Sequence, residues 1–582
     1  MKRRDRNRAV AALTLGALVA FQGAARADDA AEEIRLIKAQ LKKLEEKVND
    51  QARKQKETQV QIHNVAVRPQ GFPAEQASIQ GRPTPGSPYG GLQGVGIAPL
   101  GGTPLPPGGY SAEEASIQGR PVPGAPSIYI NGVTITPGGF LAAESVFRSR
   151  NIGADITTPF ANIPYNNVRT GNANEYRMSA RASRVSLLVQ GDVNPTTHLS
   201  GWMDLDFLGA AQTANSNESN SFTPRIRNIY LTMDQDDFGF HVLAGQNWSL
   251  LTANTRGIMP RTENTPLTID TQFVPGFNWA RQPQIRVVKD FDKTLWFAVS
   301  AENPQTNTFV GPGAQAGPFV GGVPTVGSTA ALPGTLVNTF VPPGSSLFNS
   351  GNSISLNHMP DIIGKVAWDP TFGDRHIHVE AYGLFRDFYN QVNGSNQDVA
   401  AGSYGGTILV PIIPQNLEFQ FTGMNGRGIG RYATGSLPDV SVNANGSLSP
   451  IQETTLLAGL IWRPQPGLDI YTYAGEEIQQ ASFSNSISAS GAVSAFGDGN
   501  PLYTNAGCSN VLSTACVGNT HLIRSITAGF WDTIYSGPFG QFRAGLQYAY
   551  VQKFSFQGFG GGAKAEENSV FTSLRYYPFQ SN

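Results

Sequence analysis

The chain has 582 residues, of which only 40% are hydrophobic, and it contains 65 glycines and 39 prolines. This composition excludes a set of compact soluble cores and favours many strands joined by many loops. The 42 Lys and Arg residues nearly balance the 43 Asp and Glu residues, so the overall charge gives no support for nucleic-acid binding.

The first residues have the three parts of a secretory signal. A basic stretch over residues 2–8 is followed by an apolar run over residues 9–21 and by Ala25-Arg26-Ala27, a small-x-small cleavage site. A membrane-anchoring helix is the alternative, but the apolar run is shorter than the roughly 20 residues needed to span hydrocarbon. We therefore predict a signal peptide over residues 1–27 and export of the mature chain.

Residues 28–57 carry the apolar spacing of a coiled coil. Ile34, Ile37, Leu41, Leu44 and Val48 lie alternately three and four residues apart among charged side chains. Isoleucine at both the first a and the first d position favours three helices over two. A single amphipathic helix lying on another surface is the alternative.

A Pro/Gly-rich linker is predicted over residues 58–126. It contains a two-copy repeat, because residues 77–86 (ASIQGRPTPG) recur almost unchanged as residues 115–124 (ASIQGRPVPG). Two copies are too few for a solenoid, and the Pro/Gly content favours an extended tether or disorder. The alternative is that the repeat docks on another component of the cell envelope.

From residue 127 to the end of the chain, apolar and polar residues alternate with the period of antiparallel strands. The runs over residues 185–190 and 199–207 are examples, joined by a tight turn at 194–197. Fourteen such strands can be identified, and one further hairpin within residues 388–451 would make sixteen. The last strand is predicted over residues 569–579.

The connections between these strands fall into two classes that alternate along the chain. Short turns are predicted at 194–197, 234–239, 290–293, 369–374, 463–467 and 536–540, and long links at 150–176, 209–222, 249–279, 303–358, 388–451, 478–520 and 554–567. A soluble β-sandwich rarely keeps two such unequal classes in strict order. We therefore predict a transmembrane antiparallel β-barrel over residues 127–582, with its turns in the periplasm and its loops outside. An even strand number places both ends of the barrel, and residues 28–126, in the periplasm.

Arginines on the predicted strands and in one loop are the strongest candidates for a solute site. A guanidinium that faces the water-filled lumen can hold a carboxylate or phosphate in a bidentate manner. The predicted channel residues are Arg181, Arg184, Arg225, Arg227, Arg256, Arg261, Arg281 and Arg286. Arg184 is the best single candidate, because Val185, Leu187 and Val189 would then face lipid. The alternative is that these arginines only contact lipid headgroups at the membrane boundary.

The link over residues 249–278 is a candidate constriction, because it carries Arg256 and Arg261 close to Glu263 and Asp270. Mixed charges on a loop folded into the lumen would set up a transverse field that orients dipolar solutes. An ordinary surface loop is the alternative. Arg181 and Arg184 differ in strand parity, so they cannot both face the lumen unless a bulge intervenes or one of them lies above the membrane.

Cys508 and Cys516 lie eight residues apart in a predicted loop, and we expect them to form a disulfide in an oxidising compartment. Two free thiols are the alternative. His376, His378 and Glu380 alternate along one strand, but a wet lumen accommodates such groups without metal, so no metal or other cofactor is predicted. No arrangement of catalytic residues supports an enzyme.

Four segments together resemble the DcaP-like trimeric porins: residues 135–148, 181–186, 244–248 and 278–284. The order of helix, linker and barrel is also similar, so the resemblance covers most of the mature chain. It implies a homotrimeric outer-membrane channel for small anionic solutes such as dicarboxylates, in contact with membrane lipid. Two alternatives are an envelope tether, whose residues 28–126 bind the cell wall or a periplasmic partner, and a barrel enzyme such as a lipid hydrolase.

Overall fold

The computed structural model describes residues 127–209, 220, 222–309, 355–392, 395–487 and 489–580. The chain divides into two compact units, residues 1–72 and 73–582, and every described residue belongs to the second. The predicted signal peptide, coiled coil and linker lie outside the described residues. Among the described residues, no helix is long and apolar enough to cross a membrane.

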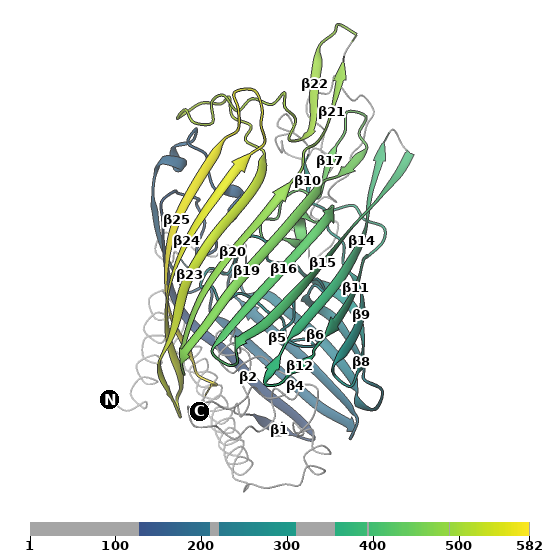
Figure 1. Ribbon diagram of the computed structural model, residues 1–582, viewed down its shortest axis with the longest axis vertical. Helices are drawn as coiled ribbons and strands as arrows, with labels where there is room; N and C mark the ends of the chain where they lie inside the picture. Colours follow the sequence, from purple (N-terminus) through teal and green to yellow (C-terminus); the bar gives the residue numbers. More distant parts are fainter. Residues whose placement is uncertain are drawn as a thin grey trace, which may run out of the picture. The chain divides into compact units, whose positions relative to one another are not determined.

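The described chain forms a closed antiparallel β-barrel with sixteen wall positions (Figure 1). Successive strands pair with their neighbours, and the last strand pairs with the first, for example through Leu141 and Tyr576. The wall strands are β2 (Val133–Arg148), β4 (Arg184–Asn194), β5 (Thr197–Asp206), β6 (Arg225–Gln235), β7 (Phe240–Trp248), β8 (Arg281–Phe291), β9 (Leu295–Glu302), β11 (Asp361–Trp368), β14 (His378–Val392), β15 (Ser395–Ile413), β16 (Leu417–Arg427), β19 (Gln452–Gln465), β20 (Leu468–Gln479), β23 (Thr520–Gly537), β24 (Gly540–Ser555) and β25 (Lys564–Tyr577).

Shorter elements extend the wall or lie in its connections. Strand β3 (Glu175–Ser179) shares one wall position with β4. Residues 144–148 of β2 pair with β3, and residues 133–140 of β2 pair with β4. The remaining elements are β1 (Ile128–Ile130), β10 (Thr308–Phe309), β12 (Thr371–Phe372), β13 (Arg375–His376), β17 (Val440–Val442), β18 (Leu448–Pro450), β21 (Ser482–Ile487) and β22 (Val493–Asp498), with the 3-10 helices η2 (Phe160–Asn162), η3 (Arg169–Asn172), η4 (Asp236–Phe238) and η5 (Gly430–Tyr432).

The two faces of the wall have the polarity of a membrane barrel. On the outward face, Val185 is 50% exposed and Leu231 is 60% exposed. On the inward face, Glu144 and Arg286 are each only 2% exposed. Exposed apolar and buried charged side chains invert the pattern of a soluble protein. They fit a barrel whose outer surface contacts hydrocarbon and whose interior is polar.

Short turns and long connections alternate along the chain as predicted, with one correction. All six predicted short turns join neighbouring wall strands at one end of the barrel, and a seventh lies between β15 and β16. The predicted hairpin within residues 388–451 is present as β15 and β16, which confirms the count of sixteen. The prediction of a long loop starting at residue 388 was wrong, because β14 and β15 stay paired out to Val392 and Ser395. Residues 388–392 and 395–399 are therefore paired strand residues and not part of a loop.

Candidate functional site

The connection between β7 and β8, residues 249–280, is folded into the lumen. All its residues are buried except Thr255, Arg256, Gln272 and Trp279, which are half-buried. Its backbone N–H groups donate to side chains of three distant wall strands: Asn254 to Glu380 of β14 at 3.0 Å, Ile269 to Gln547 of β24 at 2.6 Å, and Gly276 to Glu477 of β20 at 2.8 Å. We name this connection the inner loop. The constriction loop that the charges suggested is therefore inside the barrel.

Apolar contacts attach the inner loop to the wall in two clusters, of which one packs Leu250, Leu251, Ile258 and Met259 against β8, β9, β11, β14 and β16. Leu267, Ile269, Phe273 and Phe277 pack in the other cluster with wall side chains of β19, β20, β23 and β25. The contact is so close that Gly276, at a φ of +87°, has no room for a side chain. An added Cβ would lie 2.1 Å from the Leu456 carbonyl oxygen. This half of the lumen is therefore filled by protein.

The other side of the lumen keeps a narrow gap between the inner loop and strands β4 to β7. Its free volume is about 10 Å³, which is about the space occupied by one water molecule. The residues that line it are Arg184, Trp202, Asp204, Arg227, Asn228, Tyr230, Asn247, Trp248, Arg261 and Glu263. We name this gap the arginine cavity, because three predicted channel arginines line it.

A β-bulge aims Arg227 into the arginine cavity. The register between β5 and β6 shifts at this point, since Asp204 pairs with Asn228 while Leu205 pairs with Ile226. Arg227 and Asn228 are consequently both buried on the inward face. Bulges re-aim side chains in this manner next to functional sites. The strand period alone could not have predicted it.

Two carboxylates hold the arginines of this wall in place. Arg227 contacts Asp204 at 2.9 Å and Asp206 at 3.0 Å, and Arg225 contacts Asp206 at 2.7 Å. The backbone of Arg184 lies opposite Asp206 in the strand register, and the Arg184 guanidinium lies 5.4 Å from the Phe140 ring centre. Burying a guanidinium requires such partners, because an unpaired buried charge is costly.

Arg281 at the start of β8 differs from these arginines. Its guanidinium lies 4.9 Å from the ring centres of both Trp248 and Trp279, within the range of cation–π contacts. Its Nε and Nη1 atoms are buried and donate no hydrogen bond to the described residues. The charged groups that act on it include Arg225 and Arg227 as well as Asp206. Arg281 therefore lies next to Trp248, which lines the arginine cavity, and the described residues leave its Nε and Nη1 donors unpaired.

The other predicted channel arginines have separate positions. Arg181 lies between β3 and β4 and contacts Asp155 at 2.7 Å, so it does not share a continuous strand with Arg184. Arg286 donates to the Trp248 carbonyl oxygen at 2.7 Å. Arg256 is half-buried on the inner loop and does not line the cavity.

The mixed charges expected on the inner loop are only partly brought together. Arg261 and Glu263 both line the arginine cavity. Asp270 lies elsewhere, where it accepts a hydrogen bond from the Thr158 backbone at 3.2 Å. Sequence reasoning also missed Asp204 and Asp206 as site residues. Their inward parity was visible, but their pairing with Arg225 and Arg227 depends on the register across β5 and β6.

The alternation of His376, His378 and Glu380 does not produce one ligand set. His378 contacts Asp369 at 2.7 Å and Glu380 at 3.1 Å, and Glu380 also contacts Lys365 at 2.9 Å. His376 lies on the exposed strand β13 and shares a hydrogen bond with Thr371. The buried members thus form an ion-pair network on the barrel wall.

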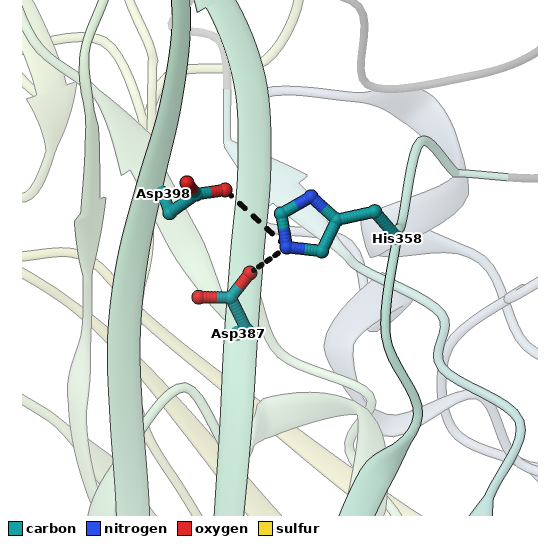
Figure 2. A group of neighbouring side chains, drawn as sticks. All are labelled: His358, Asp387 and Asp398. Atoms are coloured by element: carbon teal, nitrogen blue, oxygen red, sulfur yellow. Dashed lines mark ion pairs between the residues drawn. The ribbon is translucent and has the colours of Figure 1, made fainter.

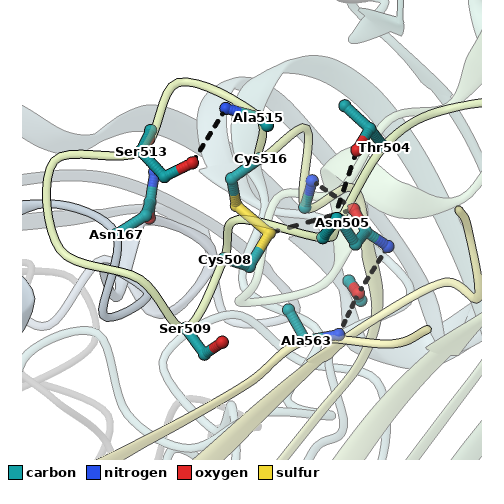
Figure 3. The surroundings of a disulfide bond; sticks show 12 residues. Asn167, Thr504, Asn505, Cys508, Ser509, Ser513, Ala515, Cys516 and Ala563 are labelled. Atoms are coloured by element: carbon teal, nitrogen blue, oxygen red, sulfur yellow. Dashed lines mark hydrogen bonds between the residues drawn. A yellow bond between two sulfur atoms is a disulfide. The ribbon is translucent and has the colours of Figure 1, made fainter. Parts of the chain in front are cut away.

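Cys508 and Cys516 are joined by a disulfide in the connection between β20 and β23 (Figure 3). The Asn505 side chain joins two segments near the disulfide by hydrogen bonds. Its Oδ1 accepts from the backbone N–H of Gly518 at 3.0 Å, and its Nδ2 donates to the Phe556 carbonyl oxygen at 2.9 Å. The bond therefore stabilises an outer connection and lies away from the arginine cavity.

Fold and lumen together define a porin-type barrel, a closed sixteen-strand wall with an inner loop that narrows the lumen. No family model and no curated protein matches the chain. Among solved structures, the outer membrane channel DcaP of Acinetobacter baumannii is 16% identical with a TM-score of 0.51, and the match covers 77% of this chain and 97% of that one. The anion-selective porin of Comamonas acidovorans is 10% identical with a TM-score of 0.40, over 76% and 99% of the two chains. The resemblance to DcaP-like porins is thus confirmed for the fold.

Proposed function

We propose that the chain is an outer-membrane channel for the passive diffusion of small hydrophilic anions, with dicarboxylates as the expected solutes. The observation that carries this proposal is Arg281, a guanidinium with unused donors beside a cavity lined by three further arginines. A carboxylate that passes this point can accept hydrogen bonds from a planar guanidinium in a bidentate manner. Membrane lipid surrounds the barrel, and a homotrimer is part of the proposal.

The width of the arginine cavity limits what can pass and how. The arginine cavity has room for about one water molecule, so we expect the side chains around it to move apart when a carboxylate passes this point. Arg261 and Glu263 belong to the inner loop rather than to the wall, so they are the side chains we expect to move. Binding must also stay weak enough for release, which the nearby Asp204 and Asp206 favour by competing for the arginines.

Reversal potentials of the purified channel in a salt gradient test the proposal. We expect R281Q to lower the anion preference while the conductance survives, because the barrel wall is unchanged. R256Q is the matched control: it removes one guanidinium from the inner loop, and Arg256 does not line the cavity, whereas Arg281 contacts Trp248, which does. R281K retains the charge without the planar donor pair, so it should keep the ion preference and weaken dicarboxylate uptake.

Two outcomes would contradict the proposal. If R281Q and R256Q have the same reversal potential as the unmodified chain, the arginines are structural and the channel is a general diffusion pore. If the unmodified chain shows no conductance, the alternative of an envelope tether is favoured.

A further inference from the structure

Three ligand-type side chains, two from the β14–β15 hairpin and one from the segment before β11, meet at the outer end of this hairpin (Figure 2). His358 Nε2 lies 2.9 Å from Asp387 Oδ2 and 3.3 Å from Asp398 Oδ1. The ligand atoms all lie within 4.8 Å of one another. This group is distinct from the arginine cavity and plays no part in the proposed passage of solutes.

Strand pairing explains why the two aspartates share a face. Asp398 of β15 pairs with Tyr389 of β14, and Tyr389 lies two residues after Asp387 on the same side of its strand. The neighbours Arg386 and Phe388 are buried on the opposite, inward face. His358 lies three residues before β11, the strand that pairs with β14 on its other side. The group therefore faces outward at the outer end of the hairpin.

The contacts leave Asp387 unsatisfied. Its side chain is only 8% exposed, and its Oδ2 accepts no hydrogen bond from the described residues, because the nearby imidazole lacks hydrogen-bond geometry toward it. One imidazole nitrogen can donate at most one proton, yet His358 Nε2 faces two carboxylates. Even a protonated imidazole leaves one excess negative charge on the three groups. A buried carboxylate oxygen without a partner is costly and calls for a cation.

We propose that His358, Asp387 and Asp398 bind a divalent transition-metal ion, with Zn²⁺ as the best fit. One imidazole nitrogen and two carboxylate oxygens are zinc ligands, and bonds of about 2.0–2.2 Å in tetrahedral geometry separate neighbouring ligand atoms by roughly 3.3 Å. The two separations from His358 Nε2, 2.9 and 3.3 Å, are close to this value, and all three ligand atoms lie within 4.8 Å of one another. Water completes the fourth position. Ca²⁺ fits less well, since it prefers six to eight oxygen ligands.

The aromatic ring of Tyr389 orients the imidazole. The His358 and Tyr389 ring centres lie 4.4 Å apart, and this contact keeps Nε2 pointed between the carboxylates. A bound ion would join the end of the connection between β9 and β11 to the hairpin β14–β15. It would therefore fix the start of β11 at Asp361, which contacts Arg386 of β14 at 3.2 Å.

Co²⁺ is the probe for this site, because its visible absorption reports coordination number. We use the full chain without a polyhistidine tag, purified in detergent, and titrate Co²⁺ before displacing it with Zn²⁺. One Co²⁺ per chain with the absorption of a four- or five-coordinate ion is expected. H358N and the double variant D387N/D398N should weaken binding by at least about tenfold, the loss seen even for outer-shell partners.

H376N is the matched control, because His376 is exposed on β13 and far from the three ligands in the fold. Heat-modifiable gel mobility verifies that each variant retains the folded barrel. Binding in H358N equal to that of the unmodified chain would overturn the proposal. An equal loss in H376N, or displacement of Co²⁺ by Ca²⁺ at the same concentration, would also overturn it.

Discussion

The inner loop faces different kinds of wall side chain on two sides of the lumen. On the side of β19 to β25, the loop packs apolar side chains against Tyr471, Tyr473 and Trp531 and fills the space. On the side of β4 to β7, the wall presents Arg184, Arg227 and Asp204, and a gap is kept. Paired charges resist dry packing because each needs its hydrogen-bond partners, whereas aromatic surface is stabilised by contact.

Hydrogen bonds fix the loop on its packed side as well. The Glu477 carboxylate accepts the backbone N–H groups of both Gly276 and Gly435, so one side chain anchors two connections. The Trp531 indole donates to the Leu267 carbonyl oxygen at 2.7 Å. Across the lumen, the Asn247 side chain of β7 donates to Glu263 at 3.1 Å, so hydrogen bonds hold the inner loop on both sides.

Removing the inner loop should have the largest effect. Replacing residues 253–277 by a short Gly-Ser linker takes away both the packed plug and one side of the arginine cavity. We expect single-channel conductance to rise several-fold, toward that of an open sixteen-strand barrel, and the anion preference to fall. Deleting the tip of the β21–β22 hairpin is the control, since it should leave conductance unchanged. An unchanged conductance after loop removal would show that the passage lies elsewhere.

Removing an acid from the arginine cavity should shift selectivity in the direction opposite to R281Q. D204N deletes one negative charge and frees one contact of Arg227. A unit charge about 8 Å away in water contributes about 0.5 kcal/mol, roughly a twofold change in local ion concentration. We therefore expect the anion-to-cation permeability ratio to rise by about twofold in reversal-potential measurements. A fall in that ratio would contradict the assignment of Asp204 to the passage.

Removing the disulfide, which lies outside the lumen, should change only the stability of the connection between β20 and β23. Closing the short loop between Cys508 and Cys516 stabilises it by about 2 kcal/mol on the chain-entropy model. In C508S/C516S, protease cleavage within residues 499–519 should become faster while the barrel keeps its heat resistance. Mass analysis of the unmodified chain should find no free thiol. Two free thiols in protein isolated from the envelope would reject this bond.

The smallest expected effect is a pH dependence in the β21–β22 hairpin, which projects beyond the wall strands (Figure 1). Burial raises the pKa of Asp498 to about 7. A raised carboxyl pKa stabilises the hairpin fully below the unfolded value, and this contribution is lost as pH rises through about 7. Hydrogen-exchange protection factors of residues 482–498, which are corrected for the base-catalysed intrinsic rate, should accordingly be lower at pH 8 than at pH 6. D498N should abolish the difference, and an unchanged difference in D498N would assign it to another group.

The local pattern of the sequence was sufficient to predict much of the barrel. Alternation of side chains fixed the inward face of Arg184 and the outward face of Val185, because strand geometry has a strict period of two. Turn-forming residues located the six short turns. The strand hairpin after residue 388 was less visible, since β15 carries Gly402, Gly405 and Gly406 in place of a clear apolar alternation.

The site was predictable as a set of residue types but not as a geometry. The bulge at Arg227 breaks the period of two, and only the register between β5 and β6 brings Asp204 and Asp206 to the arginines. The unused donors of Arg281 depend on two tryptophans, one of which lies across the strands and the other on the inner loop. Contacts of this kind are set by closure of the barrel.

By itself, the sequence determined a barrel with unequal connections and arginines of inward parity, because these properties follow from the period of two and from turn-forming residues. Tertiary structure alone decided that residues 249–280 enter the lumen, since the acceptors Glu380, Glu477 and Gln547 lie on strands far along the chain. It also brought His358 to Asp387 and Asp398, through the pairing of β11 and β15 with β14. The local sequence pattern determines which face of the wall a side chain lies on. Which side chains contact one another depends on how all the strands pair in the closed barrel.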